Sequence, residues 1–127
     1  GCLPDAAPVD EIYVGNWDEE AAADGLKQLQ KLRSKPTAVC IGDDFLLMHF
    51  LRLAREAEIK IPQQLAVVGR GSTLSIQMLG SRISMVEADP YAIATAAVEL
   101  LVEQVREKRA PGKIKKITPK LVVRQSG

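Results

Sequence analysis

Short apolar runs alternate with longer amphipathic stretches along this chain. The apolar runs are typical of strands that are covered on both faces in a parallel sheet. The amphipathic stretches repeat apolar side chains at the spacing of a helix that buries one face. The pattern predicts strands at residues 11–15, 37–42, 65–69, 82–87 and 121–123. It predicts helices at residues 17–33, 45–57, 74–79 and 91–108.

Polar residues mark the starts of these helices. Asn16 stands three positions before Glu19, which is the spacing of a capping box. Asp43 can cap the helix over residues 45–57. Asp89-Pro90 is the clearest start, because aspartate can cap free amides and proline suits the first helical position.

Strands that alternate with helices predict an α/β fold, a three-layer sandwich with a mostly parallel sheet. The chain has 127 residues, so residues 1–127 are expected to form one domain. Ligands of open α/β sheets bind outside the carboxyl ends of the strands. The stretch Gly69–Ser72, a glycine-bracketed turn after the apolar run at residues 65–69, is therefore the first place to look for function.

Composition excludes several classes of protein. A net charge of +1 gives no general attraction to nucleic acid or anionic membranes, and no apolar run approaches the roughly 20 residues that span a bilayer. Cys2 and Cys40 make no disulfide framework, and Cys40 lies in an apolar run where a thiol behaves as a small hydrophobe. We therefore expect a cytoplasmic protein. Without an initiator methionine, the chain is expected to be a fragment of a longer one.

The sequence offers no convincing catalytic or metal site. His49 is the only histidine, and no cluster of cysteine, histidine and aspartate with ligand spacing surrounds it. Asp43 and Asp44 are adjacent, and adjacent carboxylates rarely converge on one substrate atom. The basic run from Arg106 to Lys116 has no interleaved aromatics, which favours a solvated surface over a nucleic-acid site. We expect no enzyme activity, no cofactor and no metal.

Six patches follow one another in an order that points to a family. They are Gly15–Trp17, Pro36–Asp44, Leu53–Pro62, Leu65–Gly69, Asp89–Leu101 and Pro119–Ser126. Together, over roughly residues 12–126, they resemble the second half of the sensor domain of LacI/GalR transcriptional regulators. The resemblance implies the C-terminal subdomain of a periplasmic-binding-protein-like (type I) fold. It also implies that a helix-turn-helix headpiece and a first sensor subdomain lie upstream.

The resemblance implies that Trp17, Asp43, Arg70, Gly71 and Ser72 contact a small-molecule effector, either a sugar or an anionic sugar derivative. Asp43 stands where the family has asparagine; a carboxylate lacks the amide donors, so it suits hydroxyl-rich ligands and disfavours anions. The alternative is that Asp43 or Asp44 only caps the following helix. Trp17 could stack on a sugar or a base, or it could be a core tryptophan.

The loop after Gly69 departs from the family. Arg70 replaces an aromatic residue, and Gly71 replaces an acid that holds sugars in the family. Arginine beside free glycine amides could instead hold a phosphate or carboxylate. The alternative is that Arg70 is a surface residue and that effector binding has been lost.

The resemblance also implies a homodimer. Its interface would be formed by Met48, Leu51, Arg52, Met78 and Leu79; the alternative is that residues 45–57 form a fully buried helix in a monomer. In the family, the helix matching residues 91–108 packs on the first subdomain. Without that subdomain, we expect the helix to fold back on its own sheet or to be buried by dimerisation or swapping.

These features favour the effector-sensing and dimerisation region of a bacterial LacI-type regulator that reaches DNA only through a headpiece outside this chain. A type I periplasmic sugar- or solute-binding protein would share the fold. An enzyme of Rossmann-like fold with a phosphate-cradling Gly69–Ser72 loop is a further alternative, against which the missing nucleophile and base argue.

Overall fold

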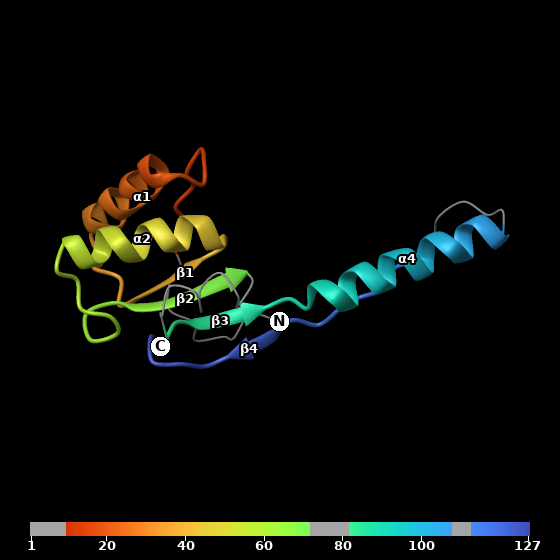
Figure 1. Ribbon diagram of the computed structural model, residues 1–127. Coiled ribbons are helices and arrows are strands. Elements are labelled where there is room, and N and C mark those ends of the chain that lie inside the picture. Colours follow the sequence, from red (N-terminus) through yellow and green to blue (C-terminus); the bar gives the residue numbers. More distant parts are fainter. Residues whose placement is uncertain (1–9, 72–81, 108–112) are drawn as a thin grey trace.

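The computed structural model describes residues 10–71, 82–107 and 113–127, and within them the strands form one mostly parallel sheet (Figure 1). The strand order is β1-β2-β3-β4; β1, β2 and β3 are parallel and β4 is antiparallel to β3. The strands are β1 (Ala38–Ile41), β2 (Ala66–Gly71), β3 (Ser84–Glu87) and β4 (Lys120–Val122). The helices are α1 (Glu19–Lys31), α2 (Asp44–Glu56) and α4 (Pro90–Glu107).

Helices α1 and α2 lie side by side on one face of the sheet, with α2 packed on β1 and β2 (Figure 1). Aspartates fix where both helices begin, because each accepts a hydrogen bond from an amide of the first turn. Asp18 Oδ1 accepts from the Ala21 amide at 2.9 Å, and Asp43 Oδ1 accepts from the Leu46 amide at 3.0 Å. The cap of α1 is therefore Asp18, and the predicted cap at Asn16 is wrong by two residues.

The core lies between these helices and the sheet. Its largest fully buried side chains are Leu47 of α2, Val67 of β2 and Met85 of β3. A Cβ added at Gly69 would lie 2.5 Å from Leu47 Cδ2 and 2.5 Å from Met85 Sδ. Glycine at this position therefore allows β2 to approach its neighbours closely.

Strand β1 differs from its prediction. It was expected to be covered on both faces, but it lies at the edge of the sheet, and Ala38 and Cys40 are exposed while Ile41 is buried. No strand among the described residues pairs with its outer edge. The predicted strand at residues 11–15 is also wrong, because this segment is in no ladder in the structure. An apolar alternation becomes a strand only where another strand supplies hydrogen bonds.

Helix α4 begins as predicted. Asp89 Oδ1 accepts from the Ala92 amide at 3.0 Å, and Pro90 is the first helical residue. The helix then runs away from the sheet, and residues 113–119 return beside it (Figure 1). We call α4 and residues 113–119 the arm. The expectation that this helix folds back on its own sheet is wrong, because only Ala88 and Asp89 separate β3 from α4 and the helix continues outward from them.

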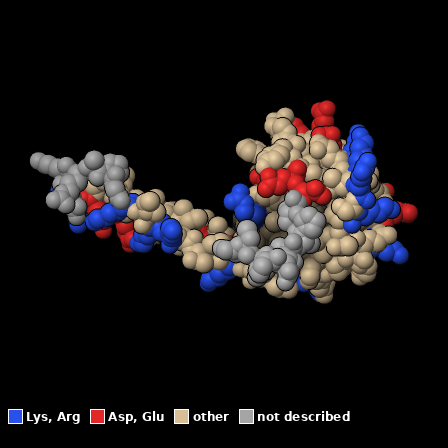
Figure 2. Space-filling model, turned by 180° about the vertical axis from the view of Figure 1, so that it is seen from behind, with Lys and Arg blue, Asp and Glu red and all other residues tan. Residues whose placement is uncertain are grey.

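Large apolar side chains lie exposed on the arm. They are Tyr91, Ile93, Val98, Leu101, Val102, Val105 and Ile114. Charged pairs hold the returning segment to the helix, with Lys113 Nζ 2.8 Å from Glu103 Oε2 and Lys115 bonded to Glu99. Side chains of both signs consequently alternate along the arm (Figure 2). This mixture supports the solvated-surface interpretation of the basic run over a nucleic-acid site.

No helix in the described ranges is long and apolar enough to cross a membrane.

Candidate functional site

The carboxyl ends of the three parallel strands meet at one edge of the sheet, which we call the carboxyl edge. The register places Ile41 beside Gly69 and Gly71 beside Glu87. Gly42 and Asp43 follow β1 directly. The structure thus brings Asp43, Arg70 and Gly71 together from separate parts of the chain, as the sequence predicted for ligand contacts.

Asp43 caps α2 and faces this edge. Its Oδ1 is occupied by the Leu46 amide at 3.0 Å, so the capping interpretation is confirmed. Within the described residues no hydrogen bond is made by the second carboxylate oxygen, Oδ2. A carboxylate has two acceptor oxygens, so one can cap the helix while the other accepts from a ligand hydroxyl. Capping and ligand binding are compatible at this residue.

Arg70 is exposed and crosses from β2 to the turn after β1. Its Nε donates to the Gly42 carbonyl at 3.1 Å. Its two terminal amino groups make no hydrogen bond within the part of the chain that the structure describes. The guanidinium is therefore anchored at one nitrogen, and its remaining donors can serve a carboxylate or phosphate.

Gly71 sits against the carboxylate of Asp44. Its φ of +154° is rarely adopted by other residues, and an added Cβ would lie 2.6 Å from both Cγ and Oδ1 of Asp44. Only glycine fits this backbone without strain. The acid that the resemblance implies at this position is therefore incompatible with the place that Asp44 occupies.

Trp17 and Ser72 are the other residues that were predicted to contact the effector. Trp17 lies just before α1 and is 71% exposed, so the interpretation as a core tryptophan is wrong. Its contact with an effector stays a prediction. Ser72 lies outside the described residues, as do Met78 and Leu79 of the predicted dimer interface and the predicted helix at residues 74–79.

The remaining predicted interface residues lie on α2. Met48 and Leu51 are half-buried and pack against the core. Arg52 is exposed and bridges Glu19 at 2.6 Å and Glu56 at 2.5 Å, and the hydrogen bonds that it donates to these two carboxylates raise the pKa of Arg52 above its ordinary value. Helix α2 is not fully buried, since Phe45 is 65% exposed at its start.

His49 is half-buried on α2. Among the described residues, no group of three or more histidine, cysteine, aspartate or glutamate side chains could hold a metal ion.

Sequence reasoning missed one residue at this edge. Arg124, three positions before the last residue of the chain, forms an ion pair with Glu87 at 2.9 Å between Nη2 and Oε1. The sequence placed Arg124 only in the closing family-like patch, Pro119–Ser126. The sequence does show a charged residue directly after the apolar run Leu121-Val122-Val123. It does not show the partner of that residue, because Glu87 lies 37 residues away.

The family model for the periplasmic binding protein-like domain matches residues 2–127. The chain belongs to this family. Known members of the periplasmic binding protein-like family resemble it over most of its length. The chain is 22% identical over 115 residues to the transcriptional repressor PurR of Photobacterium profundum. The matched residues make up 91% of this chain and 34% of PurR. The chain thus spans about a third of the length of the curated relatives it matches.

Solved structures show the same fold. A protein from Bacillus cereus subsp. cytotoxis assigned as a LacI transcriptional regulator superposes with a TM-score of 0.78 at 22% identity, covering 88% of this chain and 40% of that one. The transcriptional regulator CelR in complex with cellobiose superposes with a TM-score of 0.72 at 20% identity, covering 86% of this chain and 32% of CelR. The α/β fold predicted from the sequence, a periplasmic-binding-protein-like domain with a mostly parallel sheet, is confirmed.

Proposed function

We propose that this region binds the small-molecule effector of a LacI-type transcriptional regulator. The observation that carries the proposal is the convergence of Asp43, Arg70 and Gly71 at the carboxyl edge, where ligands of open α/β sheets bind. The relatives support it, since they include the repressor PurR and the regulator CelR in complex with cellobiose.

The region itself performs no chemistry in this proposal. Effector binding at the carboxyl edge favours one arrangement of this region relative to the rest of the protein, and so shifts a conformational equilibrium. A headpiece outside this chain binds DNA. In a homodimer, the distance between the two headpieces decides whether both can bind their DNA half-sites at the same time. The cytoplasm is the compartment that such a regulator requires. We do not propose a periplasmic solute-binding protein, because the relatives named above are regulators.

The effector we propose is a sugar or an anionic sugar derivative. Oδ2 of Asp43 can accept a hydroxyl, and the terminal amino groups of Arg70 can donate to a phosphate or carboxylate. Both groups belong to the same edge, so a ligand that carries hydroxyls and one anionic group satisfies both.

Calorimetric titration of the complete protein with neutral sugars and with sugar phosphates tests this proposal. If an anion is bound, Arg70→Gln should weaken sugar phosphate binding roughly 10- to 150-fold, because a hydrogen bond to a charged group is worth about 1.5–3 kcal/mol. Arg55→Gln, which changes an exposed arginine in the last turn of α2, is the matched control and should leave binding unchanged. Tighter binding of neutral sugars would remove the anionic class, and binding of neither class would contradict the proposal.

A further inference from the structure

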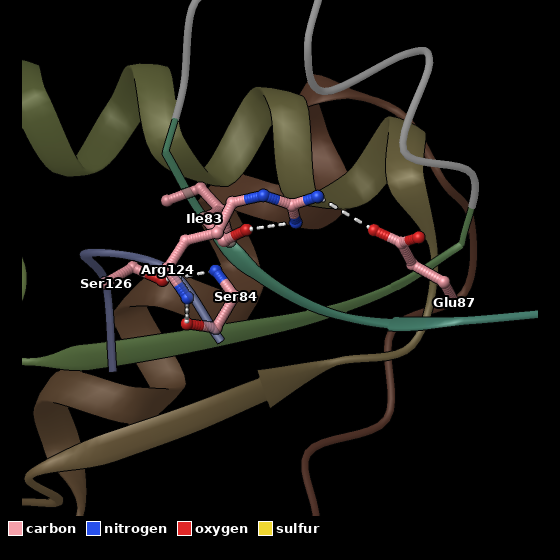
Figure 3. A network of polar contacts seen from close by, with 5 residues as sticks. All are labelled: Ile83, Ser84, Glu87, Arg124 and Ser126. Atoms are coloured by element: carbon pink, nitrogen blue, oxygen red, sulfur yellow. Dashed lines mark hydrogen bonds and ion pairs between the residues drawn. The ribbon is translucent and has the colours of Figure 1, made fainter. Parts of the chain in front are cut away.

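We propose that Arg124 and Glu87 form a latch that fixes the direction of the arm relative to the carboxyl edge. The inference concerns the coupling between two parts of the molecule, and it does not depend on which effector binds. Figure 3 shows the five residues involved, Ile83, Ser84, Glu87, Arg124 and Ser126. The strand pair at the base of the arm needs this side-chain contact to hold one orientation.

Within the described residues, the arm is joined to the body through two strands. The chain leaves through β3 into α4, and it returns through residues 113–119 into β4. The β3–β4 ladder is short, with register pairs Met85–Val122, Val86–Leu121 and Glu87–Lys120. Strand β3 is held in the sheet by β2, but β4 pairs only with β3 among the described strands. The base of the arm therefore needs further contacts if the arm is to keep a fixed direction.

Arg124 supplies contacts along the whole of β3. Its backbone amide donates to Ser84 Oγ at 2.9 Å, and its Nη1 donates to the Ile83 carbonyl at 2.9 Å. Its Nη2 donates to Glu87 Oε1 at 2.9 Å (Figure 3). One side chain thus links residues just before β3 to the last residue of that strand.

The other end of the latch is anchored in the body. Ser126 is 2% exposed, and its Oγ donates to the Val67 carbonyl at 2.6 Å while it accepts from the Ser84 amide at 2.8 Å. The Val67 amide donates to the Ser126 carbonyl at 2.7 Å. Buried polar groups that are satisfied in this way hold their positions. The backbone around Arg124 is thereby fixed to β2, while its side chain reaches Glu87 at the base of the arm.

The Arg124–Glu87 pair is better shielded from water than the other ion pairs of the described residues. The exposed fractions of its side chains are 23% and 26%, whereas the other pairs range from 42% to 62%. A charge-assisted hydrogen bond gains strength when it is partly removed from solvent, while exposed pairs contribute little. This pair is therefore the one able to hold an orientation.

Glu87 links the latch to the candidate site. It pairs with Gly71 in the register of β2 and β3, and it lies two residues before Asp89, the cap of α4. A ligand group at the carboxyl edge that competes for the Glu87 carboxylate or the Arg124 guanidinium would release the arm. This coupling rests on the proposed function, whereas the latch itself is present without any ligand.

Distance measurement between two spin labels tests the latch on the chain alone. With Cys2 and Cys40 changed to serine, cysteines introduced at Lys27 on α1 and Thr95 on α4, both exposed, carry the labels. Labelled chain is diluted into unlabelled chain so that double electron–electron resonance reports only distances within one molecule. Glu87→Gln and Arg124→Lys should each broaden the distance distribution at least twofold relative to the parent.

Glu99→Gln is the matched control, because it removes the Lys115–Glu99 pair within the arm and leaves the base of the arm intact. It should keep the narrow distribution of the parent. Circular dichroism shows whether each variant is folded; if Arg124→Lys unfolds, Glu87→Gln decides alone. A folded Glu87→Gln chain with the parent's distribution, or a parent with an already broad one, would overturn the latch. Because no effector is added, these outcomes are independent of the effector titration.

Discussion

Gly69 has no side chain, and the space that a Cβ would need is filled by two fully buried side chains, Leu47 and Met85. Both are enclosed by the core and have little room to move, so an added methyl group must displace them. Gly69→Ala should lower the free energy of unfolding by about 1–3 kcal/mol, the usual cost of overpacking. Chemical denaturation followed by circular dichroism measures this change.

Gly15→Ala is the control for that substitution. An added Cβ at Gly15 meets no atom within 4 Å, so its stability should stay within about 0.5 kcal/mol of the parent, as for ordinary surface changes. Equal effects at the two positions would show that β2 does not approach α2 and β3 as closely as the structure has it.

The role of a single residue was predictable where its partner lies close to it in the sequence. Asp89 and Asp43 cap the helices that they were expected to start, because a cap involves an amide only three positions away. Arg124 was not predictable in the same way, since its side-chain partners, Ile83 just before β3 and Glu87 at the end of β3, lie 41 and 37 residues away. The requirement for glycine at position 71 also depends on Asp44 from another element.

At the scale of elements, the returning segment of the arm is held to α4 by charge. The Lys113 ammonium, hydrogen-bonded to Glu103 at 2.8 Å, lowers the pKa of the Glu103 carboxyl. A carboxyl whose pKa is lower in the folded chain contributes stability above its unfolded pKa and loses it as the pH falls through the folded value. Acidification should therefore remove the contribution of the Lys113–Glu103 pair to the contact between residues 113–119 and α4.

Carboxyl NMR titration of Glu103 measures this effect, with the chemical shifts of residues 113–119 followed in parallel. Lys113→Gln should return the pKa of Glu103 toward its ordinary value, since it removes the ammonium. Glu103→Gln should remove the pH-dependent change at Lys113 that follows the Glu103 carboxyl, while Lys115 still responds to its own partner, Glu99. A Glu103 pKa unchanged by Lys113→Gln would show that the pair does not form in solution.

Elements with a local period were predicted well, and those that depend on pairing were not. Helices α2 and α4 match their predicted ranges to within about two residues because the period of apolar residues lies within the segment itself. The strand predicted at residues 11–15 is absent from the sheet, since a strand needs a partner that its own sequence does not specify. For the same reason, the apolar run that became β1 gave no sign that it would lie at an edge.

At the scale of the whole molecule, two apolar surfaces can bring copies of the chain together. One is on α2, where the resemblance places the homodimer, and the other is on the arm. Leu51→Glu should convert a dimer to a monomer if α2 forms the interface, because a buried unpaired carboxylate at an interface is costly. Light scattering coupled to size-exclusion chromatography gives the mass of each species.

Leu101→Glu is the companion variant, placed on the exposed face of α4. It should leave an α2-mediated dimer intact. Release of monomers by Leu101→Glu alone would assign association to the arm, and a monomeric parent would contradict the homodimer. Because Leu51 also packs against the core, its variant must keep the parent's circular dichroism spectrum to be informative.

The outer edge of β1, with which no strand of the described residues pairs, has a practical consequence for this chain as an isolated protein. An unpaired strand edge offers its amides and carbonyls as a template on which another chain can add a strand. Cys40 is exposed on that strand, so two edges that meet also bring their thiols within reach of one another. The isolated chain should therefore be kept dilute during purification and storage, so that strand edges do not associate. A reducing agent should be present as well, so that Cys40 thiols of two chains do not form a disulfide.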